Sequence, residues 1–127
     1  MKNDNSINKL TEKVIGCALA VHKELGPGLL ESTYKFCLAE ELKTSGIAFK
    51  TEVEIPVNYK NKVIDCGYRL DFLIENRLIV ELKSVSEITD IHKAQVLTYM
   101  KLAGVPLGLL INFNVRLLKN GIQRFIF

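Results

Sequence analysis

Two short stretches of alternating side chains, separated by a turn, constrain the fold of this 127-residue chain more than any other feature. Residues 69–74 and 78–83 each place an apolar side chain at every second position, as strands do because successive side chains point to opposite faces of a sheet. A turn centred on Asn76 would pair Ile74 with Leu78 and place Asp71 opposite Glu81. One face of this hairpin is then wholly apolar and carries Leu70, Phe72, Ile74, Leu78, Val80 and Leu82.

The other face of the hairpin combines acids with bases. It carries Arg69, Asp71, Leu73, Ile79, Glu81 and Lys83. Two carboxylates about 5 Å apart repel each other, and a bound Mg²⁺ ion would compensate for this repulsion. Lys83 points to the same side, where it would stabilise charge on a phosphate or help to deprotonate a water molecule. The alternative is a solvated outer face on which Arg69 and Lys83 simply neutralise the two acids.

Three amphipathic helices are predicted around the hairpin. The first ends at Gly26-Pro27-Gly28, and its apolar face consists of Ile7, Leu10, Val14, Ala18 and Val21. Its start could be capped by Asn3, Asp4 or Asn5. The second covers residues 30–44, ends at Gly46 and turns four side chains inward, namely Leu30, Tyr34, Leu38 and Leu42. The third covers residues 90–102, begins at Thr89 or Asp90 and ends at Gly104. The first two should form an antiparallel pair.

β-Branched and aromatic residues predict further strands from Thr51 onward. These are expected over residues 51–59, 63–74, 78–83 and 105–113, with a turn at Lys60-Asn61-Lys62. Asn120-Gly121 predicts a short hairpin between residues 117–119 and 122–127. This order of elements describes an α/β (α+β) fold, a central mixed β-sheet flanked by helices, in a single domain over residues 1–127.

Charge and cysteine usage exclude several classes of protein. The net charge is only +3, from 17 Lys and Arg against 14 Asp and Glu, which excludes a charge-saturated nucleic-acid binder but leaves room for a locally basic groove. The longest apolar runs, such as residues 105–111, are far shorter than the ~20 residues of a membrane helix. Cys17, Cys37 and Cys66 form no Cys-x-x-Cys pair, and the polar start is no secretory signal. Together these features indicate a cytoplasmic protein with reduced thiols.

Further polar residues lie on the predicted helices. His92, Gln95 and Tyr99 fall within one arc of the third helix, where they would follow a phosphate backbone or orient Lys83. Glu31 lies near the start of the second helix, as a charge favoured by the helix dipole or as a further carboxylate aimed at a metal ion. His22 precedes the Gly26-Pro27-Gly28 turn, as a structural side chain or as one that faces the cleft.

The segment Gly28-Leu29-Leu30-Glu31-Ser32-Thr33-Tyr34 resembles the G-x-x-E-x-x-Y signature of the bacterial and archaeal GxxExxY proteins, a group of the PD-(D/E)XK nuclease superfamily. The resemblance extends over nearly the whole chain, through residues 21–28, 68–71, 80–83, 92–95 with 98–99, and 110–114. It implies a restriction-endonuclease-like core, in which helices flank a mixed four-stranded sheet. Leu70 stands where the motif's name has Pro, a residue that is often absent across the superfamily.

The resemblance also implies a function. Asp71, Glu81 and the main-chain carbonyl of Leu82 are expected to bind Mg²⁺ or Mn²⁺, with Lys83 as the catalytic lysine and Glu31 as an additional acid. The expected substrate contacts are Gln95, Tyr99, His92, Tyr34 and His22. The expected activity is metal-dependent hydrolysis of phosphodiester bonds in DNA, with no membrane partner and with a second copy or a partner protein to help grip a duplex. The alternative is a non-catalytic module that binds nucleic acid or protein on the same scaffold.

Overall fold

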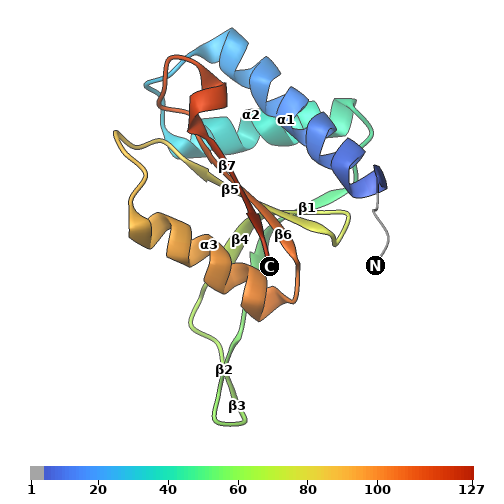
Figure 1. The fold of residues 1–127 in the computed structure, drawn as a ribbon, viewed down its shortest axis with the longest axis vertical. Helices are drawn as coiled ribbons and strands as arrows, with labels where there is room; N and C mark the ends of the chain where they lie inside the picture. Colours follow the sequence, from blue (N-terminus) through green and yellow to red (C-terminus); the bar gives the residue numbers. More distant parts are fainter. Residues whose placement is uncertain (1–4) are drawn as a thin grey trace.

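The computed structural model describes residues 5–127 and contains a five-stranded mixed sheet between two layers of helices (Figure 1). The sheet order is β1 (Phe49–Glu54), β4 (Arg69–Ile74), β5 (Leu78–Lys83), β6 (Leu107–Asn112) and β7 (Ile122–Ile126). Among the strands described in this sheet, β5 and β6 alone are parallel, and α3 (Asp90–Ala103) makes the crossover between them. These elements confirm the mixed α+β fold expected from the sequence.

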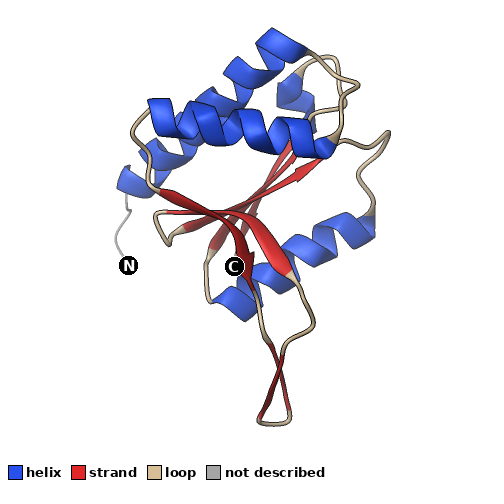
Figure 2. Cartoon of the chain, turned by 180° about the vertical axis from the view of Figure 1, so that it is seen from behind, coloured by secondary structure: helices blue, strands red, loops and turns tan. Residues whose placement is uncertain are grey.

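The helices cover opposite faces of the sheet (Figure 2). The α1 helix (Asn5–Leu25) and the α2 helix (Glu31–Thr44) pack against each other on one face, in the predicted antiparallel arrangement, and α3 lies on the other face. Two of the capping residues considered for α1, Asn3 and Asp4, lie outside the described residues. No helix among residues 5–127 has both the length and the apolar composition needed to cross a bilayer.

Most of the inward positions predicted on α2 are correct, with one exception at its start. Tyr34, Leu38 and Leu42 are fully buried. Leu30 instead occupies the N-cap position with extended backbone and is 74% exposed. The cap residue precedes the first helical turn, so its side chain does not follow the helical face that packs on the sheet.

Two of the expected strands are each divided into two. Residues 51–59 contribute to β1 and to β2 (Val57–Tyr59), and residues 63–74 contribute to β3 (Lys62–Ile64) and to β4. The β2 and β3 strands pair only with each other, and their hairpin extends away from the main sheet (Figure 1). Pro56 cannot donate a ladder hydrogen bond and Gly67 has a φ of 76°, so the backbone leaves the sheet near both residues.

The hairpin predicted at Asn120-Gly121 is wrong. These residues belong to a short 3₁₀ helix (Leu118–Gly121), and β7 pairs with β6 rather than with residues 117–119. A Cβ atom at position 121 would collide with the main-chain oxygen of Asn112. The glycine therefore permits a close approach of two backbone segments, which a sequence pattern does not distinguish from a tight turn.

The sheet separates two apolar cores, and one residue lies in a different core from the one predicted. Phe72 and Val80 pack on the side of α1 and α2, whereas Leu70 packs with Met100 on the side of α3. The ladder between β1 and β4 keeps one register at both ends but lacks a pair at Glu52 and Asp71, and Glu52 has a φ of 52°. The strands therefore twist at this point, and Leu70 does not share a face with Phe72.

Candidate active site

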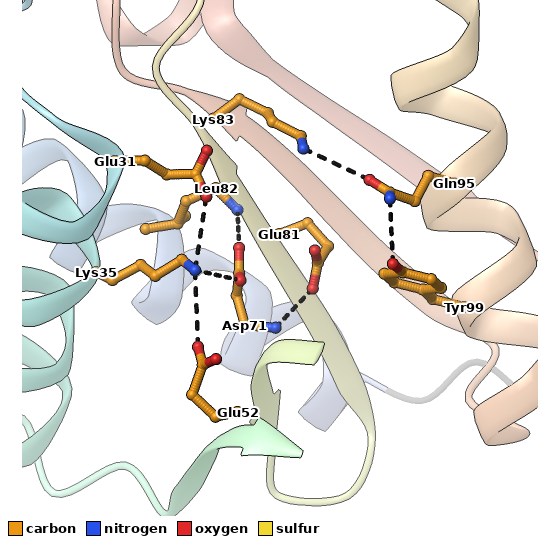
Figure 3. A network of polar contacts seen from close by, with 9 residues as sticks. All are labelled: Glu31, Lys35, Glu52, Asp71, Glu81, Leu82, Lys83, Gln95 and Tyr99. Carbon is orange, nitrogen blue, oxygen red and sulfur yellow. Dashed lines mark hydrogen bonds and ion pairs between the residues drawn. The ribbon is translucent and has the colours of Figure 1, made fainter. Parts of the chain in front are cut away.

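The carboxylates of Asp71 and Glu81 interrupt the β4–β5 ladder and replace its hydrogen bonds. The predicted register is confirmed from Ile74–Leu78 to Phe72–Val80. Beyond this pair, the Asp71 amide donates to Oε2 of Glu81 at 2.7 Å, and the Leu82 amide donates to Oδ2 of Asp71 at 2.8 Å (Figure 3). Each carboxylate is therefore held in place by the main chain of the opposite strand.

Burial of this pair makes the ionised form of Glu81 unfavourable. Glu81 is only 5% exposed. Burial, followed by repulsion from the Asp71 carboxylate, raises the pKa of Glu81 from 4.5 to about 8, against the opposing effects of the Asp71 amide and Lys83. A nearby cation would stabilise the ionised carboxylates and offset both effects, so the pair forms a site that favours positive charge.

Lys35 supplies a positive charge next to Asp71. Its Nζ atom lies 2.8 Å from Oδ1 of Asp71, 3.5 Å from Oε2 of Glu31 and 3.6 Å from Oε2 of Glu52 (Figure 3). Burial alone would lower the pKa of Lys35, but the hydrogen bond to Asp71 and the attraction of the three carboxylates outweigh burial and raise it. Glu31 and Asp71 contact the same ammonium group, so the structure brings the two predicted acids close together.

Lys35 and Glu52 are site residues that the sequence analysis missed. A signal existed for Lys35, because it follows Glu31 by four residues on a helix, the spacing at which opposite charges meet. No comparable pattern marked Glu52, which lies in a strand and reaches the site through its left-handed backbone.

A second chain of polar contacts runs from β5 to α3. Lys83 Nζ lies 3.5 Å from Oε1 of Gln95, whose Nε2 donates to the Tyr99 hydroxyl at 3.1 Å (Figure 3). Burial, followed by the negative charge of Glu81, raises the pKa of Tyr99. Gln95 thus lies beside Lys83 and Tyr99 beside Gln95, which agrees with their shared arc on the helix. The Tyr99 hydroxyl keeps its proton at neutral pH.

Three of the residues expected to contact substrate have local structural roles. Tyr34 has no exposed surface; its hydroxyl bonds to the loop before α2 and its ring stacks on Phe113, which corrects the expectation that it contacts substrate. His22 is 8% exposed, and its Nε2 lies 2.8 Å from the Val115 carbonyl oxygen. His92 forms the capping box of α3 with Thr89. The structure does not bring these residues into the Lys83–Gln95–Tyr99 chain.

Asn112 fixes the segment that follows Lys83. Its side chain is 3% exposed, accepts from the amides of Val85 and Asn114, and donates to the Val85 carbonyl. The end of β6 therefore anchors the connection from β5 to α3. The sequence marked Asn112 only as part of the segment 110–114 that resembles the family, and its positioning role was not predicted.

The carboxylate oxygens of the site are suitable ligands for a divalent cation, although the Lys35 ammonium neutralises part of their negative charge. Within residues 5–127, no three His, Cys, Asp or Glu side chains converge closely enough to hold a metal ion on their own. Mg²⁺ requires less, because it is usually held by one or two carboxylates together with waters and substrate phosphates. The oxygens of Asp71 and Glu81 provide such a pair, and Lys35 demonstrates that a cation is accommodated in front of Asp71.

Comparison with known proteins agrees with this architecture. Residues 8–125 match the family model of the PD-(D/E)XK nuclease superfamily. No curated protein and no solved structure gave a match. The matched range contains every strand of the main sheet up to residue 125, together with Asp71, Glu81 and Lys83. The chain therefore belongs to the PD-(D/E)XK nuclease superfamily, and it has the sheet and helix arrangement of a restriction-endonuclease-like fold.

Proposed function

We propose that this chain is a nuclease that uses Mg²⁺ or Mn²⁺ to hydrolyse phosphodiester bonds in DNA. The observation that carries the proposal is the reciprocal bonding of Asp71 and Glu81 to the opposite strands, beside Lys83. Superfamily membership supports a nuclease-type function. A solvated outer face, the alternative considered from the sequence, would leave these acids exposed, whereas Asp71 and Glu81 are 8% and 5% exposed.

Asp71, Glu81 and the main-chain carbonyl of Leu82 would hold the ion, with Glu31 as an additional acid. When bound, the ion would neutralise the scissile phosphate and activate the attacking water. Lys35 pairs with Asp71, Glu31 and Glu52 in this structure. Binding of the ion would therefore require Lys35 to break at least its contact with Asp71. Its side chain is 28% exposed and can move toward solvent without crossing the core.

The other polar residues would act on the substrate itself. Lys83 would stabilise negative charge that develops on the phosphate. Gln95 limits the positions available to the Lys83 ammonium, and Tyr99 in turn orients the Gln95 amide. The Tyr99 hydroxyl also keeps a proton that it can donate to a phosphate oxygen.

We further propose that the chain is a member of the GxxExxY group. The residues of the G-x-x-E-x-x-Y signature each have a definite structural position. Gly28 has a φ of 97° in the loop between α1 and α2, Glu31 faces the Lys35 ammonium, and Tyr34 bonds back to Gly26 and Leu29. The Ser84 hydroxyl, next to Lys83, donates to the Leu29 carbonyl at 2.6 Å, so the loop is tied to the candidate site.

The cysteines and the size of the chain bear on its location and its partners. Three unpaired cysteines favour the reducing cytoplasm as its location. The chain offers little surface with which to grip a duplex, which favours a homodimer or a partner protein during DNA binding. A single nuclease-like domain over residues 1–127 remains part of this proposal.

A cleavage assay with labelled single-stranded, duplex and plasmid DNA tests the function. We expect cleavage with Mg²⁺ or Mn²⁺, none with EDTA, and loss of cleavage in Asp71→Asn, which removes the charge but retains the shape of the side chain. Glu75→Gln is the matched control, because Glu75 is an exposed acid in the turn of the same hairpin. This control should cleave as the wild type does.

Equal behaviour of the wild type and Asp71→Asn at stoichiometric protein would reject catalysis at this site. If the wild type binds DNA equally well with and without the ion, and Lys83→Ala binds as tightly, then the chain is a non-catalytic binding module on a nuclease scaffold. Isothermal titration calorimetry measures both affinities.

A further inference from the structure

A pocket of about 420 Å³ lies beside the candidate active site, between α3 and the start of the β2–β3 hairpin. Its volume is within the range of sites for small organic groups. Its walls are formed mainly by Val57, Tyr68, Ile91, Gln95, Thr98 and Tyr99. The role of this pocket is not explained by the metal site or by Lys83.

The pocket shares a wall with the polar chain that ends at Lys83. Gln95 and Tyr99 line the pocket and also form the two contacts that follow Lys83. A group that occupies the pocket therefore contacts Gln95, the residue whose side chain bonds to the Lys83 ammonium. If the scissile phosphate binds at Lys83, the occupant belongs to a part of the substrate near that phosphate.

The chemistry of the walls suits a flat, largely apolar group with polar edges. Tyr68 is 45% exposed and its ring centroid lies 6.2 Å from that of Tyr99, with the planes tilted by 52°. Ile91 is 76% exposed on the first turn of α3. Gln95 and Thr98 add hydrogen-bonding groups to the same walls. No Lys or Arg lines this pocket within residues 5–127, so it suits a base better than a phosphate.

The β2–β3 hairpin begins at the pocket with Val57 and carries positive charge at its turn. Lys60 and Lys62 are exposed at its turn, with Asp65 as the acid that follows β3. Lys60 lies over the ring of Tyr59, with 5.4 Å between Nζ and the ring centroid. A nucleic-acid strand that places a base in the pocket can thus continue toward aromatic and cationic groups, the combination that binds single strands.

We propose that this pocket binds the base of an unpaired nucleotide adjacent to the scissile phosphate, so that the preferred substrate is single-stranded DNA or a frayed DNA end. This inference rests on the proposed nuclease function. A base inside a duplex is stacked on both faces and paired at its edge, so it cannot enter the pocket without first being unstacked. An unpaired base enters without that cost and stacks on Tyr68.

The test measures binding in EDTA, where no cleavage occurs. The probe is a single-stranded oligonucleotide that contains 2-aminopurine, a base analogue whose fluorescence changes when it stacks on an aromatic side chain. We expect a fluorescence change with the wild type and about tenfold weaker binding by Tyr68→Ala, with loss of that change. Ile91→Ser, at a position that is 76% exposed, should weaken binding in the same way without adding charge. Affinity for a blunt duplex of the same sequence should stay within about twofold in both variants.

Phe36→Ala is the matched control, because Phe36 is an aromatic side chain on α2 that is 68% exposed and does not line the pocket. The inference is overturned if the wild type gives no fluorescence change, if both pocket variants bind single strands as tightly as the wild type, or if single-strand and duplex affinities fall equally. Because the assay excludes the metal ion, absence of cleavage would reject the proposed function without affecting this result. Cleavage by a wild type that shows no fluorescence change would reject the pocket inference alone.

Discussion

The Lys35 ammonium lies 2.8 Å from Oδ1 of Asp71, while the other oxygen of that carboxylate accepts from the Leu82 amide. Both oxygens of Asp71 therefore have partners within the chain. One of these partners is the ammonium of a partly exposed side chain, and the other is a main-chain amide. A metal ion at Asp71 would have to compete with Lys35, and this competition leads to the first prediction.

Replacement of Lys35 by Met should increase the affinity for Mn²⁺, because the metal ion no longer has to displace the Lys35 ammonium from Asp71. A partly exposed ion pair contributes about 1 kcal/mol, which corresponds to an increase of about fivefold in affinity. The metal-free variant should unfold at a lower temperature than the wild type, because three acids lose their shared partner. Calorimetric titration with Mn²⁺ and thermal melts in EDTA measure the two effects.

Lys43→Met provides the control for this prediction. Lys43 lies on the same helix and pairs with Glu40 at 3.3 Å, but its side chain is 66% exposed and lies outside the site. This control should bind Mn²⁺ as the wild type does. Unchanged or weaker Mn²⁺ binding in Lys35→Met would mean that Lys35 supports the metal position rather than competing for it.

The stability of the metal-free protein should fall as the pH rises from about 4.5 to about 8. Burial and the neighbouring Asp71 raise the pKa of Glu81 to about 8, so the folded state keeps a proton that the unfolded state releases above pH 4.5. The folded state then binds more protons across this window, and the free energy of unfolding decreases with pH. Urea unfolding in EDTA at several pH values measures the slope, which should be shallower in Glu81→Gln. Equal slopes in the two proteins would show that Glu81 titrates normally.

Replacement of Tyr34 by Phe should destabilise the protein by about 1–2 kcal/mol, because the Gly26 carbonyl and the Leu29 amide lose their buried partner. Stacking of the ring on Phe113 is retained. Chemical denaturation measures the loss, and Tyr59→Phe, at a residue that is 59% exposed, serves as the neutral comparison. The KM of Tyr34→Phe for DNA should equal that of the wild type. An increase in KM without loss of stability would instead show that Tyr34 contacts the substrate.

Replacement of Lys83 by Met should lower kcat by about 10²–10⁴-fold, the range for a group that assists charge or proton movement in the transition state. Mn²⁺ affinity should stay within about twofold of the wild type, because the ligand oxygens belong to other residues. Rapid-quench kinetics and Mn²⁺ titration measure the two quantities. Joint loss of activity and of metal binding would assign Lys83 to the structure of the site instead.

Much of the candidate site could be predicted from local patterns. The hairpin of residues 69–83 combines a period-two alternation with a turn whose Glu75 and Asn76 adopt positive φ, so its register follows from the sequence. The spacing of Gln95 and Tyr99 places them on one side of a helix, where they form a hydrogen bond. These relationships involve residues near one another in the chain, or on strands joined by a short turn.

Relationships between distant segments could not be predicted in this way. Glu52 and Asp71 disrupt a strand pair that otherwise keeps its register, and the change of face at Leu70 follows from this distortion. Propensity and periodicity describe regular strands, so they carry no signal for an irregular pair. The expected strand over residues 51–59 ran through Pro56, so neither the break at that residue nor the separate pairing of β2 with β3 was predicted.

The sequence by itself determined the acidic hairpin, because alternation and turn chemistry act over a few residues. Only the tertiary structure decided what surrounds that hairpin. Packing of α2 on the sheet brings Lys35 to Asp71, and packing of α3 beside the start of β2 forms the pocket at Tyr68 and Tyr99. Both depend on how separate elements bury their apolar faces against one another, and many side-chain patterns satisfy that requirement equally well.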